Sequence, residues 1–190
     1  MSISADLSGK RIAILATNGF EQSELMEPLK RLREAGAKVD VIAPEDGEIR
    51  GWQKKDWGAS VPVDKKLSEA APADYDSLVL PGGQINPDLL RVDKKALAFI
   101  AAFYEAKKPI AAICHAPWLL IETGIANGLK ATSYHSIKTD MKNAGADWVD
   151  EAVVVDQGII TSRNPDDLEA FCDKIAEETL EGRHEKRKVA

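Results

Sequence analysis

The sequence predicts a single α/β domain, a three-layer α/β/α sandwich built around a mostly parallel sheet. Short apolar runs typical of buried strands alternate with segments of helical spacing along the chain. The first two runs, residues 11–17 and 38–44, flank one helix, as in the crossover of a parallel sheet. With 190 residues the chain has the usual size of one domain. We expect this domain to cover residues 10–181, between a flexible N-terminus (1–9) and a charged C-terminal tail (182–190).

The elements follow from periodicity and from turn residues. Leucines at helical spacing before Gly36 predict a helix over 24–35. Glycines, tryptophans and charges over 47–62 favour a short antiparallel excursion or lid. The other expected elements are strands at 77–80, 109–113 and 131–134, a helical turn at 87–90, helices at 94–106, 116–121 and 137–144, a hairpin over 153–161, and a last helix that starts at Pro165 with Asn164 or Ser162 as its cap.

Composition and charge narrow the range of partners. The chain is 44% hydrophobic and 29% charged, with a formal net charge of -6. Because no basic stripe offsets this charge, we expect no stable complex with nucleic acid and no membrane partner. The basic cluster Arg183, Lys186, Arg187 and Lys188 is interpreted as a solvated, fraying tail. No signal peptide and no span-length apolar segment is recognisable, so we expect a cytoplasmic protein.

The two cysteines, Cys114 and Cys172, lie far apart in the sequence, and we expect both to be reduced. Cys172 follows the apolar pattern of the last helix and is predicted to pack in the core. The chain has no CxxC motif, and its three histidines have no metal-ligand spacing. We therefore expect neither a metal nor a cofactor.

Cys114 and His115 lie at the turn between the apolar run 109–113 and a helix. A side chain on such a turn is held out at the carboxyl end of the sheet, where backbone N–H groups point at its ligand. A helix N-terminus also lowers the pKa of a thiol and so favours the reactive thiolate. Cys114 is therefore a candidate nucleophile at a nucleophile elbow; the alternative is a small, buried, inert cysteine.

Two further segments end at the same edge: the loop after the first strand, with Glu21 and Glu24, and the turn Pro81-Gly82-Gly83. We expect them to meet Cys114 in the fold. A carboxyl buried beside a thiolate is driven to its protonated state, from which it can donate a hydrogen bond to sulfur. Alternatively, the two glutamates are only the acidic first turn that helices favour.

Several motifs occur together in a specific order. Their joint spacing strongly resembles that of the PfpI family of intracellular proteases, in the superfamily of the Parkinson-disease protein deglycase. The resemblance runs almost end to end and implies a flavodoxin-like, class I glutamine amidotransferase-like fold. The motifs are FEQSELxxP (20–28), LVLPGG (78–83), AAICHAP (111–117), TSY (132–134), DMKNAGAxWVD (140–150) and SRxPxDL (162–168).

The resemblance implies roles for the residues at the expected site. Cys114 would be the nucleophile with His115 as its neighbour, and the backbone N–H groups of Gly83 and His115 would form the oxyanion site. Glu24 matches the family's carboxyl that is hydrogen-bonded to the cysteine, and Glu21 would line the pocket. Tyr134 matches a tyrosine near the cysteine.

In PfpI-like members a glutamate from a neighbouring subunit completes a Cys-His-acid arrangement. The equivalent segment here, residues 84–88, offers Asp88 as the candidate inter-subunit acid. Asp88 is one methylene shorter, and the loop looks one residue longer. This departure weighs against proteolysis.

The resemblance implies a stress-response, cysteine-dependent enzyme that acts on reactive carbonyls or their adducts, as a deglycase or a glyoxalase. Its partners would be small carbonyl compounds or glycated protein, and it would form a homodimer or a hexamer of dimers. One alternative is an oxidation-sensing stress protein in which Cys114 becomes a sulfinic acid bonded by Glu24. The others are an intracellular cysteine peptidase and a chaperone-like role.

Overall fold

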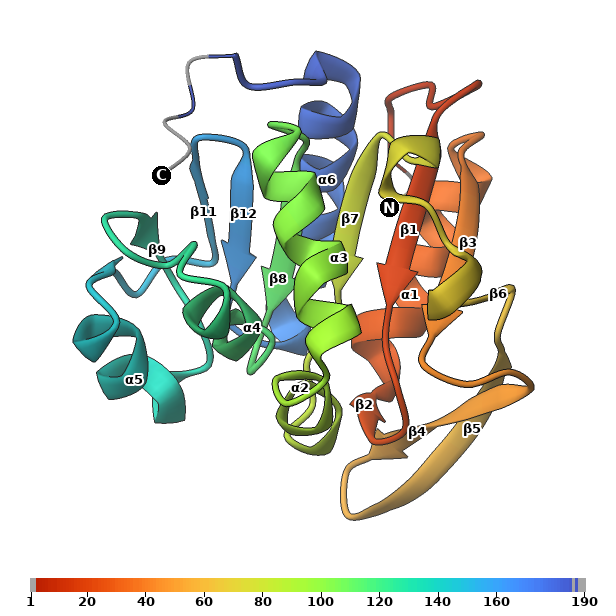
Figure 1. Cartoon of the computed structure of the whole chain (residues 1–190), viewed down its shortest axis with the longest axis horizontal. Helices are drawn as coiled ribbons and strands as arrows, with labels where there is room; N and C mark the ends of the chain where they lie inside the picture. Colours follow the sequence, from red (N-terminus) through yellow and green to blue (C-terminus); the bar gives the residue numbers. More distant parts are fainter. Residues whose placement is uncertain (1–2, 186, 188–190) are drawn as a thin grey trace.

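A seven-stranded sheet forms the centre of the molecule, in the order β11-β12-β8-β7-β1-β3-β6. The structure is a computed structural model that describes residues 3–185 and 187. All neighbouring strands run parallel except β11 and β12, which pair as an antiparallel hairpin (Figure 1). The mostly parallel sheet is therefore confirmed. Its strands are β1 (Arg11–Leu15), β3 (Lys38–Ala43), β6 (Lys65–Lys66), β7 (Ser77–Leu80), β8 (Ile110–Ile113), β11 (Val153–Asp156) and β12 (Ile159–Ser162).

Helices cover both faces of this sheet, which gives the predicted three layers (Figure 1). In β1, Ile12 and Ile14 face one hydrophobic cluster, and Ala13 and Leu15 face another. This alternation follows from the two-residue period of a strand that is buried on both faces. The first cluster includes α1 (Gln22–Glu34) and α6 (Leu168–Glu181), and the second includes α3 (Lys94–Glu105) and α4 (Pro117–Glu122). Within the described residues, none of the helices combines the length and hydropathy needed to cross a lipid bilayer.

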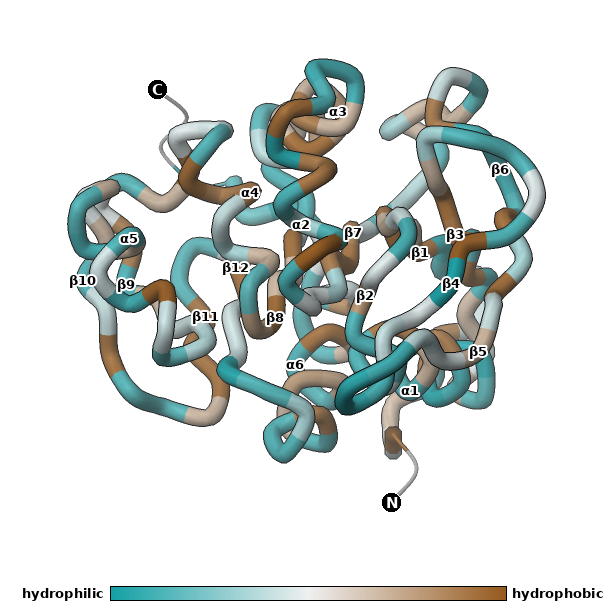
Figure 2. The backbone as a smooth tube through the Cα atoms, turned by 90° about the horizontal axis from the view of Figure 1, so that it is seen from below, coloured by the Kyte–Doolittle hydropathy of each residue, from teal (hydrophilic) through white to brown (hydrophobic). Residues whose placement is uncertain are grey.

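The predicted antiparallel excursion is present as a hairpin of β4 (Glu48–Gln53) and β5 (Asp56–Pro62). The hairpin is extended by the two-residue strand β2 (Phe20–Glu21), which pairs with β4 and was not predicted because it is so short. Figure 2 views the edge where the parallel strands end, with β2 and this hairpin on one side and β11 with α5 on the other. The remaining elements are α2 (Ile85–Leu90), β9 (Lys130–Ala131), α5 (Lys138–Asn143), β10 (Asp147–Trp148) and short 3-10 turns at Leu67–Glu69, Pro72–Asp74, His135–Ile137 and Pro165–Asp167.

Two predicted boundaries differ from the structure for a local reason. Thr132 to Tyr134 do not continue β9, because the N–H of Thr132 donates to Thr161 Oγ1 and that of Tyr134 donates to the Cys114 carbonyl. The last helix opens as a 3-10 turn before α6 begins at Leu168. Its predicted cap is confirmed, since Asn164 Oδ1 accepts from the Asp166 N–H at 2.9 Å.

The described residues at both ends of the chain pack on the domain, in contrast to the predicted flexible N-terminus and solvated tail. Leu7 is fully buried, and its N–H donates to the Ala35 carbonyl at 2.7 Å. Arg187 is 3% exposed, and its guanidinium donates to the carbonyls of Gln157 and Lys108 at 2.6 and 3.0 Å. A guanidinium that satisfies buried carbonyls anchors the chain end. Two members of the basic cluster, Lys186 and Lys188, lie outside the described residues.

Both cysteines are free thiols. Cys172 is fully buried in α6 and belongs to the hydrophobic cluster beneath α1 and α6, which confirms its predicted role in core packing.

The cap of α3 provides a test of the fold. Asp93 accepts hydrogen bonds from the N–H groups of Lys95 and Ala96. We expect Asp93→Ala to lower the free energy of unfolding by about 1 kcal/mol, because two N–H groups of the helix lose their acceptor. Asp93→Asn keeps an acceptor and should stay close to wild type. Urea denaturation of the three proteins checks this, and equal losses for both variants would contradict the capping role.

Candidate active site

Three segments converge at the carboxyl edge of the sheet: the loop after β1, the turn after β7 and the turn after β8. Asn86 in α2 joins the first two. It is fully buried; its Oδ1 accepts from the Thr17 N–H at 2.7 Å, and its Nδ2 donates to the carbonyls of Pro81 and Gly82 at 2.8 and 3.2 Å. Sequence reasoning missed Asn86; the available signal was an asparagine directly ahead of a proline, three residues after a glycine pair.

Cys114 occupies a strained elbow directly after β8. Its φ of 64° lies in the left-handed region that residues with a side chain rarely adopt. Hydrogen bonds fix the backbone on both sides, from the Cys114 N–H to the Ser162 carbonyl (3.0 Å) and from the Tyr134 N–H to the Cys114 carbonyl (2.8 Å). The side chain is held at the edge of the sheet with 6% of its surface exposed. This geometry is the predicted nucleophile elbow.

Glu24, on the first turn of α1, faces the thiol across Gly82. The carboxyl is fully buried, and its Oε2 accepts from the Gly82 N–H at 2.9 Å. A Cβ on Gly82 would lie 2.5 Å from Glu24 Oε2 and 2.7 Å from Cys114 Cβ, so only glycine fits between them. The other carboxyl oxygen, Oε1, is buried and has no hydrogen-bond partner of acceptable geometry.

The electrostatics favour the protonated forms of both Glu24 and Cys114. Burial, followed by the charge of Glu21, raises the pKa of Glu24 to about 8. Burial, followed by the charge of Glu24, also raises the pKa of the Cys114 thiol, whereas the N–H groups of Gly83 and His115 lower it. The expected lowering by the helix N-terminus is therefore outweighed by burial. A protonated Glu24 removes the negative charge that opposes the thiolate.

His115 contacts the thiol from another side. Its Nδ1 lies 3.2 Å from Cys114 Sγ, and its Nε2 lies 3.2 Å from Ser136 Oγ. The ring stacks on Tyr134, with centroids 4.8 Å apart. Burial, followed by the charge of His135, lowers the pKa of His115, so the neutral imidazole is favoured. Ser136 was missed by sequence reasoning; the only signal was a hydroxyl two residues after the tyrosine motif.

The thiol opens into a pocket of about 490 Å³, within the usual range for small-molecule sites. The pocket combines acids, aromatic rings and hydroxyl groups. Trp52 reaches it from the β4–β5 hairpin, a contribution that sequence reasoning did not anticipate. The lining residues are Glu21, Glu24, Trp52, Gly83, Gln84, Cys114, His115, Tyr134, Ser136 and Pro165. Of the residues expected at the site, all but Asp88 meet here.

Asp88 is exposed on α2 and lines a second hollow with Gln84, Ile85, Leu89 and Trp118. Gln84 also lines the pocket of Cys114. The structure does not bring Asp88 to His115, so its role as an inter-subunit acid stays a prediction. A thiol in contact with an imidazole and beside a buried carboxyl supports addition of the sulfur to an electrophilic carbon, with proton transfer by the neighbouring side chains.

The chain is similar to known proteins over most of its length. The family model described as "DJ-1/PfpI family" matches residues 10–178. General stress protein 18 of Bacillus subtilis is 47% identical over 86% of this chain and 94% of its own. Protein/nucleic acid deglycase 2 of Escherichia coli is 44% identical over 85% and 93%. The crystal structure of Drosophila melanogaster DJ-1beta superposes with a TM-score of 0.79, at 31% identity over 95% of both chains.

The raised pKa of Glu24 predicts a pH-dependent stability. Because its pKa rises from 4.5 to about 8 on folding, the native state binds the proton more tightly and unfolding releases it within this window. This stabilising contribution is fully present below about pH 4.5 and is lost as the pH rises to about 8. We expect Glu24→Gln to remove the corresponding fall in the free energy of unfolding, measured by urea denaturation across this range.

Glu27→Gln is the matched control, since Glu27 is a partly exposed residue on the same helix. It should keep the pH dependence of the wild type. A Glu24→Gln variant that loses stability with rising pH as steeply as the wild type would contradict the assignment of the proton to Glu24.

Proposed function

Because the chain belongs to the DJ-1/PfpI family, we propose that it is a stress-response enzyme that uses Cys114 to process reactive carbonyls or their adducts. The observation that carries this proposal is the thiol held between two proton-transferring groups. His115 Nδ1 lies 3.2 Å from the sulfur, and the buried carboxyl of Glu24 faces it across Gly82. A deglycase or glyoxalase needs this combination of nucleophile and proton carriers.

The proposed first step is addition of Cys114 Sγ to the carbonyl carbon of the substrate. As the carbon–sulfur bond forms, the carbonyl π-electrons move to oxygen, where the N–H groups of Gly83 and His115 stabilise the charge. Both N–H groups lower the pKa of the thiol, which supports their role beside the reacting atoms. His115 Nδ1, 3.2 Å from the sulfur, takes the proton that the thiol loses, and Glu24, with a pKa of about 8, donates its proton to the carbonyl oxygen. The product of this step is a neutral hemithioacetal, and a proton passed on from the imidazolium of His115 restores Glu24.

Small carbonyl compounds and glycated protein are the proposed substrates. The pocket suits a short-chain carbonyl or one modified side chain, and the deglycase name of a 44% identical relative supports adducts of this kind. The net charge of -6 opposes a stable nucleic-acid complex. We further propose that the enzyme is a homo-oligomer. In this assembly Asp88 would contribute its carboxyl to the site of a neighbouring subunit.

A second candidate function is oxidation sensing. The buried Glu24 Oε1 has no hydrogen-bond partner, and in its protonated form it would donate to an oxygen of an oxidised Cys114. A peptidase is less well supported, because within the chain the second nitrogen of His115 contacts a serine hydroxyl instead of a carboxylate.

Turnover of methylglyoxal, and its release from a glycated peptide, test the carbonyl-processing role. We expect wild-type turnover above the spontaneous background, loss to background for Cys114→Ser, and a decrease of at least about a hundredfold for Glu24→Gln, which cannot donate the same proton. Free amines and thiols trap the aldehyde, so the buffer must contain neither.

Cys172→Ala is the matched control, because Cys172 is the other free thiol and lies in the core of α6. It should turn over substrate like the wild type. If wild type and Cys114→Ser both match the blank, the enzyme proposal fails. Intact mass after mild peroxide then decides whether Cys114 accumulates a stable sulfinate, as the sensor would require.

Ser136 is expected to act as a positioning residue, because its hydroxyl fixes the ring of His115 through Nε2. Loss of one such hydrogen bond corresponds to about a tenfold decrease in kcat for Ser136→Ala, with little change in KM. Ser136→Thr keeps the hydroxyl and should restore most of the rate. Steady-state kinetics over a pH series check this; equal rates for the alanine and threonine variants would contradict it.

A further inference from the structure

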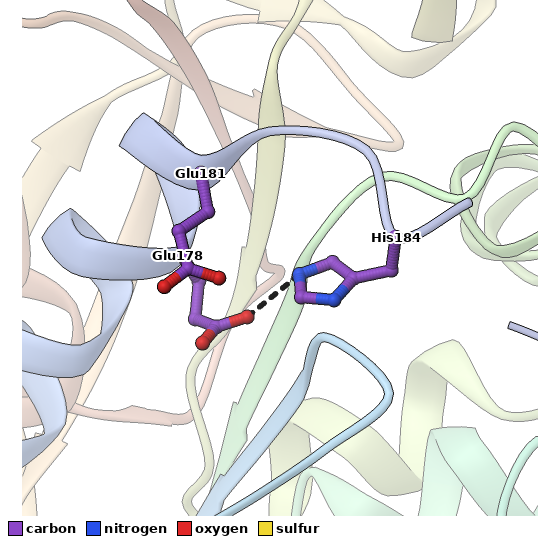
Figure 3. Close-up of side chains that lie close together, drawn as sticks. All are labelled: Glu178, Glu181 and His184. Atoms are coloured by element: carbon purple, nitrogen blue, oxygen red, sulfur yellow. Dashed lines mark ion pairs between the residues drawn. The ribbon is translucent and has the colours of Figure 1, made fainter. Parts of the chain in front are cut away.

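Three metal-ligand side chains meet at the end of α6, far from the thiol. Glu178, Glu181 and His184 each present one donor atom, and these atoms all lie within 4.8 Å of one another (Figure 3). The strands run in the opposite direction to α6, so this cluster lies at the edge of the sheet opposite the Cys114 pocket (Figure 1). The cluster therefore has no part in the chemistry proposed above.

The sequence brings these donors together through one turn of helix and one chain reversal. Glu178 and Glu181 are three residues apart on α6 and so share a face. Gly182, with φ of 82°, ends the helix and turns the chain back. The backbone N–H of His184 then donates to the Lys107 carbonyl at 2.9 Å. This bond fixes the backbone that carries the imidazole. A search for histidine and cysteine spacing misses this arrangement because two of its donors are carboxylates.

Glu178 gives the cluster a feature that an ordinary surface ion pair lacks. The residue is 5% exposed, and its Oε2 lies 2.7 Å from His184 Nε2. Both atoms are buried, yet neither has a hydrogen-bond partner of acceptable geometry. The two atoms form an ion pair when the imidazole is protonated, and with a neutral imidazole whose Nε2 carries no hydrogen they are two lone-pair atoms that face the same space. Figure 3 shows the Glu181 carboxylate beside them.

The surroundings hold this geometry in place. A Cβ on Gly158, in the β11–β12 turn, would lie 2.2 Å from His184 Cδ2, so the ring packs directly against that turn. Arg187 lies near enough to Glu178 to interact with its charge, but its guanidinium donates to the carbonyls of Gln157 and Lys108. The Nε and Nη1 atoms of the guanidinium therefore bind the backbone, and Nη2 is buried without a hydrogen-bond partner among the described residues, so Arg187 forms no ion pair with either carboxylate.

We propose that Glu178, Glu181 and His184 bind a divalent transition-metal ion of the zinc type. Two carboxylates and one imidazole are a common set of protein ligands for Zn²⁺, with water in the fourth position. The imidazole disfavours Mg²⁺ and Ca²⁺, which require oxygen ligands. The ion would join the end of α6 to the segment that binds Lys107, Lys108 and the β11–β12 turn, and so would fasten the C-terminal part of the fold.

Zn²⁺ titration by calorimetry tests this site, with full-length Cys114→Ser as the parent so that the catalytic thiol does not bind the metal. We expect one Zn²⁺ per chain and a rise in melting temperature on addition of Zn²⁺ but not of Mg²⁺. Glu181→Gln is the decisive variant, because it leaves the Glu178–His184 pair intact and removes the third donor. It should weaken Zn²⁺ binding at least tenfold without changing the melting temperature of the metal-free protein.

Glu177→Gln is the matched control, since Glu177 lies on the same helix and pairs with Lys174 at 2.6 Å. It should bind Zn²⁺ like the parent. If the parent binds no Zn²⁺, or if Glu181→Gln binds it as tightly as Glu177→Gln, the cluster is only an ion pair and the proposal is overturned. Because Glu181 is exposed, its substitution keeps the test valid even if His184 variants do not fold.

Discussion

Glu24 and Cys114 face each other inside the protein, where two negative charges cannot both be solvated. At least one of the two groups must therefore stay protonated, and most of the local structure follows from this constraint. Gly82 lacks a side chain because any Cβ would collide with the carboxyl oxygen and with Cys114 Cβ. The N–H of Gly82 donates a hydrogen bond to Oε2 of Glu24. The other oxygen, Oε1, accepts no such bond and can interact with the sulfur. The strained backbone of Cys114 keeps the thiol within this contact and is held there by hydrogen bonds to Ser162 and Tyr134.

The parallel topology brings the segments that form this contact to the same edge of the sheet. β1, β7 and β8 are neighbours in the sheet, so the loops after them end at one edge, although they come from three distant parts of the sequence. Asn86 then fixes the first two loops relative to each other through three hydrogen bonds. Because both faces of the sheet are covered by helices, the edge is where a polar site can open to solvent.

The elements and the convergence of Glu24, Gly83 and Cys114 were predictable, because both rest on periodicity and on the rule that parallel strands end at a common edge. The direction in which the pKa of the Cys114 thiol shifts was not predictable. Burial is a property of the assembled site, and it outweighs the local effect of a helix N-terminus. Ser136 and Trp52 were missed for a related reason. Their contacts depend on how a 3-10 turn and a hairpin pack against the elbow, which no spacing in the sequence encodes.

The partner of His115 bears on which reaction the site favours. Peptide hydrolysis expels an amine that must be protonated, and a catalytic histidine does this as an imidazolium stabilised by a carboxylate. Here burial lowers the pKa of His115, and its Nε2 contacts a neutral hydroxyl. Addition of a thiol to a free aldehyde expels no leaving group: a base takes the proton of the thiol, and the carbonyl oxygen receives one. Glu24, with a pKa near neutrality, is suited to supply that proton. The electrostatics of the single chain thus suit addition to a free carbonyl better than peptide cleavage.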